Sequence, residues 1–144
     1  MAIPARVSII TLGVGDLERS RSFYLALGWE EMSSSVPGVI SWFKTAETYL
    51  GLHSYEDLAK DGRMAVGHRE GFGGVTFAIN LESDEAVIAA LADAVAAGAS
   101  VLKGPEQAIF GGLSAYFADP DGYPWELAHN PSFPLGKDGR ITIP

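Results

Sequence analysis

The spacing of apolar residues predicts a strand and then a helix near the start of the chain. Residues 6–14 (RVSIITLGV) are rich in β-branched side chains, and the segment is too short for a buried helix, so it predicts a strand. Within residues 17–27, apolar side chains recur at the spacing of a helix. Asp16 is placed to cap the first turn of this helix, and Gly28 directly follows its last turn. Three short extended runs follow at 29–34, 39–45 and 48–54. This part of the chain is therefore expected to fold as strand, helix and three strands.

The same order of elements returns in the second half of the chain. Residues 74–80 (GVTFAIN) predict a strand, and Ser83 caps a predicted helix that reaches residue 97. Extended runs follow at 100–103, 109–118 and 124–129, with the turn sequence DPDG at 119–122 before the last of them. The chain thus reads as one βαβββ unit that occurs twice, and each unit is too small to close a core alone.

These boundaries divide one expected domain into four segments. The units are 1–61 and 73–129, and the Gly-rich stretch 62–72 is a linker after a short helical piece. The tail 130–144 is rich in Pro and Gly. We expect it to follow the surface as ordered coil, with its apolar residues Phe133, Leu135 and Ile141 packed down; disorder is the alternative.

Composition restricts the classes of partner. The 144 residues include no Cys, so disulfides, cysteine zinc sites and thiol nucleophiles are excluded. The formal charge of −8 disfavours nucleic acid and anionic membranes. The first residues lack the basic and apolar regions of a secretory signal, which favours a cytoplasmic location.

Two sequence blocks carry a family resemblance. They are VSIITLGVGDLERSRSFYLALGWE at 7–30 and YFADPDGYPWELAHNP at 116–131. Together with the βαβββ order that occurs twice along the chain, these blocks resemble the vicinal oxygen chelate superfamily, which includes glyoxalase I, bleomycin-resistance proteins and extradiol dioxygenases. The resemblance implies an α+β, glyoxalase-like fold, in which two βαβββ repeats form curved mixed sheets around an open cup.

The resemblance also implies a divalent metal in the cup, held by His or Glu on the first and last strands of each unit. The corresponding positions here are Ile9, Gly51, Gly74 and Glu126. Only Glu126 has a side chain that can coordinate, and one carboxylate makes a poor transition-metal site. We therefore expect no cofactor; a divalent metal is the alternative.

Glu126 and His53 are the candidate catalytic residues. Glu126 would act as a general base, and His53 shares a strand face with Gly51 because the two differ by two positions. The plainer alternative is that His53 ends an edge strand and meets solvent. His68 lies in the linker and His129 has the opposite parity to Glu126, so neither is favoured as a ligand.

Strand alternation assigns the remaining side chains to two faces. The cup face should carry Val7, Thr11, Tyr49, Thr76 and Ala128, and the helix-covered face Ser8, Ile10, Leu12, Val14, Val75, Phe77 and Ile79. One residue of each pair Trp42–Phe43 and Tyr116–Phe117 should face the cup. Thr11, Tyr49, Thr76, Trp42 and Tyr116 are the expected ligand-pocket residues, although they can also pack only against each other or a second subunit. Asp119 and Asp121 are expected to be structural turn residues.

The sequence favours a small-molecule-binding member of this superfamily without a catalytic metal. Exposed sheet edges favour a homodimer. The alternative is a metal-dependent lyase, isomerase or dioxygenase that uses Glu126. A third class is an interaction module whose cup is filled by side chains.

Overall fold

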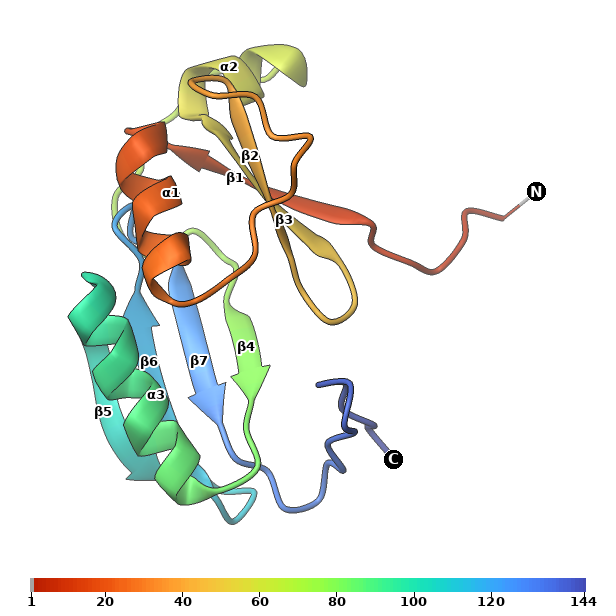
Figure 1. The fold of residues 1–144 in the computed structure, drawn as a ribbon, viewed down its shortest axis with the longest axis vertical. Coiled ribbons are helices and arrows are strands. Elements are labelled where there is room, and N and C mark those ends of the chain that lie inside the picture. Colours follow the sequence, from red (N-terminus) through yellow and green to blue (C-terminus); the bar gives the residue numbers. More distant parts are fainter. Residues whose placement is uncertain (1) are drawn as a thin grey trace. The chain divides into compact units, whose positions relative to one another are not determined.

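The computed structural model describes residues 2–144, and the chain divides into two compact units (Figure 1). Unit 1 is Met1–Gly67 and unit 2 is His68–Pro144. The helices within residues 2–144 include none with the length and hydropathy of a membrane-spanning segment.

Unit 1 is a three-stranded mixed sheet with α1 (Leu17–Ala26) on one face (Figure 1). The strand order is β1 (Ile9–Val14), β3 (Tyr49–Ser54), β2 (Ile40–Lys44). The central strand β3 runs parallel to β1 and antiparallel to β2. A short helix, α2 (Tyr55–Asp61), continues directly from β3.

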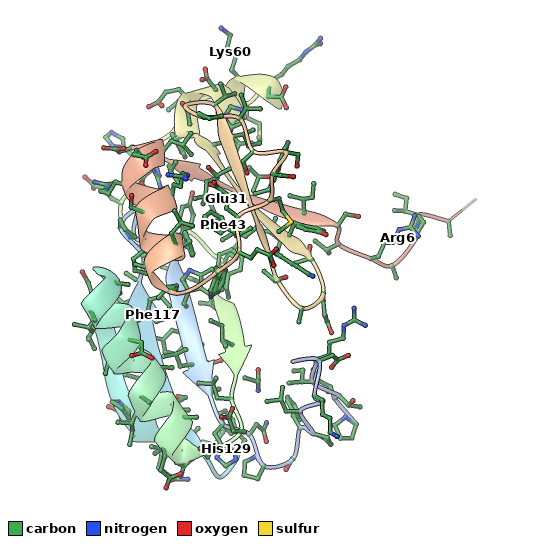
Figure 2. The ribbon with its side chains drawn as sticks, viewed as in Figure 1. Arg6, Glu31, Phe43, Lys60, Phe117 and His129 are labelled. Carbon is green, nitrogen blue, oxygen red and sulfur yellow. The ribbon has the colours of Figure 1, made fainter. Side chains whose placement is uncertain are left out.

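The first helix forms as its sequence predicts. The Asp16 carboxylate accepts the backbone N–H of Arg19 at 3.0 Å, which satisfies one of the unpaired donors of the first turn. Its inner face buries Phe23 and Tyr24, and the Tyr24 ring lies 5.8 Å from that of Phe43 on the sheet below (Figure 2). Burial of these aromatic side chains fixes α1 on the sheet.

The extended run predicted at 29–34 is not a regular strand, and this prediction is wrong. Its backbone meets β2 at isolated points: Met32 N–H donates to Trp42 O at 2.8 Å, and Lys44 N–H donates to Glu30 O at 3.0 Å. The Ser35 hydroxyl then accepts the Trp42 N–H at 2.9 Å. A side chain thus takes the place of a backbone partner, so the ladder ends there.

Unit 2 has the complete βαβββ order (Figure 1). It consists of β4 (Phe77–Asn80), α3 (Asp84–Ala97), β5 (Ser100–Gln107), β6 (Leu113–Ala118) and β7 (Pro124–Ala128). The sheet order is β4-β7-β6-β5, in which β4 is parallel to β7 and the other pairs are antiparallel. Helix α3 packs on β5, β6 and β7.

Three strand boundaries in unit 2 differ from the predicted ones. β5 continues through Gly104-Pro105, where a break was expected, with register shifts on both sides of Lys103. A proline is tolerated because β5 is an edge strand and its outer N–H groups need no partner. β6 begins at Leu113, after a turn at 108–112, rather than at 109. β4 begins at Phe77 rather than at 74.

Asp119 is a structural turn residue, as predicted. Its buried carboxylate accepts the backbone N–H groups of Asp121 at 3.0 Å and Tyr123 at 2.9 Å. These bonds satisfy backbone donors that would otherwise lack partners in the reversal between β6 and β7.

The tail after β7 is mainly turns and coil. Leu135 and Ile141 form a backbone bridge, and both side chains, like that of Phe133, are half-buried.

The carboxylate of Asp84, in the first turn of α3, bonds to the start of β6 and to the residue after β7. Asp84 Oδ1 accepts the Leu113 N–H at 3.0 Å and the Nδ1–H of His129 at 2.8 Å. These bonds hold the pKa of the Asp84 carboxyl below its ordinary value, with the His129 bond as the larger cause. A carboxyl with a lowered pKa stabilises the fold above its unfolded pKa, and that contribution is lost as pH falls through the folded pKa.

We therefore expect Asp84→Ala to lower the thermal unfolding midpoint at about pH 6, and to cost progressively less as the pH falls below the ordinary pKa of an aspartate carboxyl, because protonation removes the charge that the two bonds stabilise. Circular dichroism melts across this range measure the difference. Asp93→Ala, on the exposed side of the same helix, is the control and should lack this pH dependence. A wild-type advantage that persists unchanged at low pH would contradict the assignment.

Candidate functional site

The sheet of unit 1 has one apolar buried face and one open face. Leu12, Val14 and Leu52 are buried on the side that α1 covers. Side chains of the opposite parity are more open, and Ile9 is 50% exposed. The open face is therefore the one that the sequence assigned to ligand binding.

Thr11, Gly51 and Trp42 form one row across this open face. The register pairs Gly51 with Thr11 on β1 and with Trp42 on β2. A Cβ atom at Gly51 would lie 2.9 Å from Thr11 Oγ1 and 3.3 Å from Trp42 Cδ1. The two side chains thus occupy the space beside Gly51, and Trp42 rather than Phe43 belongs to the open face.

His53 lies on the same face, one pleat further along β3. The alternative of an edge strand is wrong, because β3 pairs with strands on both sides. The His53 side chain is half-buried, and its buried Nδ1 atom meets no hydrogen-bond partner within residues 2–144. An unpaired buried polar atom carries a desolvation cost, so a ligand group that pairs with it would be stabilised.

The open face of unit 2 carries a row of polar side chains. The register aligns Ala78, Glu126, Tyr116 and Lys103 across β4, β7, β6 and β5. The neighbouring positions on this face are small, namely Ser114, Ala118 and Ala128. The face toward α3 instead carries the large apolar residues Phe117, Trp125 and Leu127, all buried. Large side chains thus fill one face, and the other keeps small ones around a polar row.

Hydrogen bonding and charge connect the members of this row. Lys103 Nζ donates to the buried Ser114 hydroxyl at 2.8 Å and lies 5.2 Å from the centroid of the Tyr116 ring. Burial raises the pKa of the Tyr116 phenol above its ordinary value, and the charge of Glu126 and a hydrogen bond with its carboxylate raise it further. The phenol therefore stays protonated and serves as a donor beside Glu126.

Lys103 and Ser114 are site residues that the sequence reasoning missed. The extended run predicted at 100–103 ends at Lys103, whereas β5 continues to Gln107 and places Lys103 inside the strand. One signal was present: Lys103 is the only Lys or Arg between Arg69 and Lys137. A lysine in a strand, within a stretch whose other formal charges are acidic, is an informative exception.

Other candidate residues lie apart from these rows. Gly74 lies outside β4, with a φ of 91°, and Thr76 directly precedes that strand; both are exposed. Val7 and His68 are also exposed, and His129 is bound to Asp84. The structure therefore groups Thr11, Trp42, Tyr49 and His53 on one face of unit 1, and Tyr116 and Glu126 on one face of unit 2.

The residues at the expected metal positions do not fit a transition metal. Ile9, Gly51 and Gly74 have no donor atoms in their side chains, which leaves the Glu126 carboxylate, directly opposite Tyr116 on the neighbouring strand. In the described part of the chain, no three His, Asp or Glu side chains are grouped as metal ligands. Transition metals need several converging donors, and this set does not supply them.

A separate pocket of about 170 Å³ lies in unit 1. Its charged groups satisfy one another, since Arg21 donates to both carboxylate oxygens of Glu31, at 2.7 and 3.2 Å, and to Glu18 at 2.9 Å. The lining residues are Glu18, Arg21, Glu31, Ser35, Pro37 and Ser41. None of the predicted site residues lies here.

Comparison with solved structures finds proteins of similar fold. A glyoxalase-related enzyme from Fulvimarina pelagi is 35% identical, with a TM-score of 0.87 over 97% of this chain and 99% of that one. A glyoxalase/bleomycin resistance protein/dioxygenase from Nocardioides is 24% identical, with a TM-score of 0.74 over 94% and 93% of the two chains. Lactoylglutathione lyase from Agrobacterium tumefaciens is 21% identical, with a TM-score of 0.65 over 88% and 94%.

Sequence comparison gives the family. A search of curated protein sequences found no match. The family model of the Glyoxalase/Bleomycin resistance protein/Dioxygenase superfamily, however, matches residues 6–127, which is most of the chain. The α+β, glyoxalase-like fold expected from the sequence is confirmed. The chain belongs to the glyoxalase/bleomycin resistance protein/dioxygenase superfamily.

Proposed function

We propose that this protein binds a small organic molecule on the open face of unit 2 without a catalytic metal. The ligand lies over the Tyr116 ring and donates a hydrogen bond to Glu126. The observation that carries this proposal is the polar row Glu126–Tyr116–Lys103, surrounded by small side chains, on the face opposite to α3. A few polar groups on an otherwise small-residue surface are typical of ligand sites.

The donor set supports binding without a metal. Three of the four positions at which the superfamily places metal ligands lack donor atoms, and the fourth, Glu126, faces a protonated phenol. The carboxylate is thereby free to accept a donor from an organic ligand rather than to complete a coordination sphere. The net charge of −8 disfavours an anionic ligand and leaves a neutral or cationic one.

Calorimetric titration with benzylamine tests this proposal, since the probe carries one ring and one ammonium group. We expect weak, saturable binding that Glu126→Gln weakens by about tenfold, the value of one charge-assisted hydrogen bond. Glu85→Gln, at an exposed position on α3, is the control and should bind like wild type. Equal binding of benzylamine by wild type and Glu126→Gln would contradict the proposal, and so would the absence of binding both by benzylamine and by an amine of the same size that also carries a carboxylate.

Titration of metal-stripped protein with Ni²⁺, Zn²⁺, Mn²⁺ and anaerobic Fe²⁺ completes the test. We expect no stoichiometric binding. Stoichiometric binding that Glu126→Ala removes would instead support the alternative, an enzyme that uses a metal.

An enzyme without a metal is the second candidate. It is favoured by the pairing of a carboxylate with a protonated phenol: Glu126 can accept a proton, and the single O–H of Tyr116 can then turn from the neutralised carboxyl to a developing oxyanion. Turnover of a carbonyl substrate that Glu126→Gln abolishes, in a variant that still folds, would establish it. The homodimer and the cytoplasmic location stay predictions from the sequence.

A further inference from the structure

We propose that the ligand of unit 2 is dipolar, with an ammonium group at Glu126 and a carboxylate at Lys103, joined by a flat spacer over the Tyr116 ring. This inference rests on the proposed function and assigns the ligand's chemical class. It also makes Lys103 a residue that determines specificity.

Lys103 has unused hydrogen-bonding capacity on the open face. An ammonium group has three N–H donors, and Ser114 Oγ accepts one of them at 2.8 Å. The side chain is half-buried and lies against the Tyr116 ring, so its ammonium group is held in place rather than free in solvent. The remaining donors suit a carboxylate, the acceptor that an ammonium group binds most strongly.

Glu126 has the complementary capacity. A carboxylate offers about four lone-pair sites, and Tyr116, the residue directly opposite Glu126 on β6, has one O–H that can use only one of them. Glu126 is half-buried, and the small side chains of Ala78 and Ala128 flank it on the same face. A ligand ammonium group can therefore approach the free carboxylate oxygen directly.

The spacing of the strands sets the length of the ligand. Glu126 on β7 and Lys103 on β5 lie on either side of Tyr116 on β6. Neighbouring strands are about 4.8 Å apart, so the two charged residues are separated by roughly 10 Å at the backbone. The Lys103 ammonium group leans toward β6, since it bonds to Ser114 and lies 5.2 Å from the centroid of the Tyr116 ring, so the two charged groups are closer together than the backbones. The strand spacing is therefore an upper limit, and one aromatic ring with a charged group at each end lies within it.

The two fixed charges select against ligands with one charge. A simple cation that approaches Glu126 is repelled by Lys103, and a simple anion at Lys103 is repelled by Glu126. A ligand with both charges meets two attractions and neither repulsion. Its net charge is zero, so the overall charge of −8 does not favour or oppose it.

Three matched probes test the inference by calorimetry: 4-(aminomethyl)benzoate, which carries both charges, benzylamine and benzoate. We expect the dipolar probe to bind about tenfold more tightly than benzylamine, and benzoate to bind weakest. Lys103→Met should remove the tenfold advantage while benzylamine binds more tightly, because a like charge is gone. Lys103→Arg should keep part of the advantage, and the tail variant Lys137→Met should behave like wild type.

The outcomes separate this inference from the function on which it rests. If benzylamine binds through Glu126 but the dipolar probe gains nothing, or if Lys103→Met weakens both probes equally, the dipolar assignment is overturned and the binding site remains. If no probe binds wild-type protein, the proposed function fails and the inference with it. Circular dichroism of each variant excludes unfolding as the cause of a lost affinity.

Discussion

Replacing Phe117 with alanine is expected to lower the free energy of unfolding by about 3–5 kcal/mol, the largest effect of any substitution considered for this chain. The Phe117 side chain is 2% exposed and lies on the face of β6 that packs under α3 (Figure 2). Its ring is stacked on Trp125 of β7, with centroids 6.3 Å apart and planes within 8°. Truncation would remove this contact and leave a cavity between sheet and helix.

Chemical denaturation followed by far-ultraviolet circular dichroism measures this loss. Val101→Ala is the matched control, since Val101 is the direct partner of Phe117 on β5 but is 50% exposed. Its truncation should cost less than about 1 kcal/mol because half of its surface already meets water. Equal losses in the two variants would show that the face under α3 is not a packed core.

Elements whose signals are local could be predicted from the sequence. Helix α3 begins after Ser83, whose hydroxyl accepts the Ala86 N–H at 3.1 Å, and ends at Gly98, whose φ of 115° suits glycine. Strand alternation likewise assigned Leu12 and Val14 to the buried face and Thr11 to the open one. Caps and alternation depend on residues that are close in sequence, so reading along the chain is sufficient.

Features that depend on distant partners could not be predicted in this way. Residues 29–34 read as a strand, but a Ser35 hydroxyl bond to Trp42 interrupts their pairing with β2. Proline in β5 is tolerated only because that strand lies at the sheet edge. A side-chain hydrogen bond therefore prevents a regular strand in the first case, and the position of the strand in the sheet permits the proline in the second.

The residues of the candidate site also fall into those that the sequence could predict and those that it could not. The family resemblance identified Glu126 as a candidate site residue. Strand alternation predicted that either Tyr116 or Phe117 lies on the open face. The register that aligns Lys103 with Tyr116 includes a bulge that no local pattern reveals. The sequence therefore predicts the carboxylate of Glu126 at one end of the polar row but not the ammonium group of Lys103 at the other end. Lys103 matters because its positive charge affects which ligand charge the site favours.

Replacing Gly51 with alanine is expected to lower the free energy of unfolding by about 1–3 kcal/mol, although glycine is usually a poor strand residue. The added methyl group would lie 2.9 Å from Thr11 Oγ1 and 3.3 Å from Trp42 Cδ1, closer than relaxed contacts allow. Thr11 is β-branched and therefore stiff, and Gly51 lies on the central strand between it and Trp42. The clash can be relieved only if these side chains move.

Two further variants make this prediction specific. Gly104→Ala is the control, because no atom lies within 4 Å of a Cβ there, and its stability should barely change. Thr11→Ala removes the closest atoms and should recover much of the loss in the double variant, which a double-mutant cycle measures. If Gly51→Ala costs no more than Gly104→Ala, the space beside Gly51 is open. If the loss and its recovery are observed, a larger ligating side chain at this position would also meet Thr11 and Trp42, so the packing beside Gly51 would leave no room for a metal ligand there.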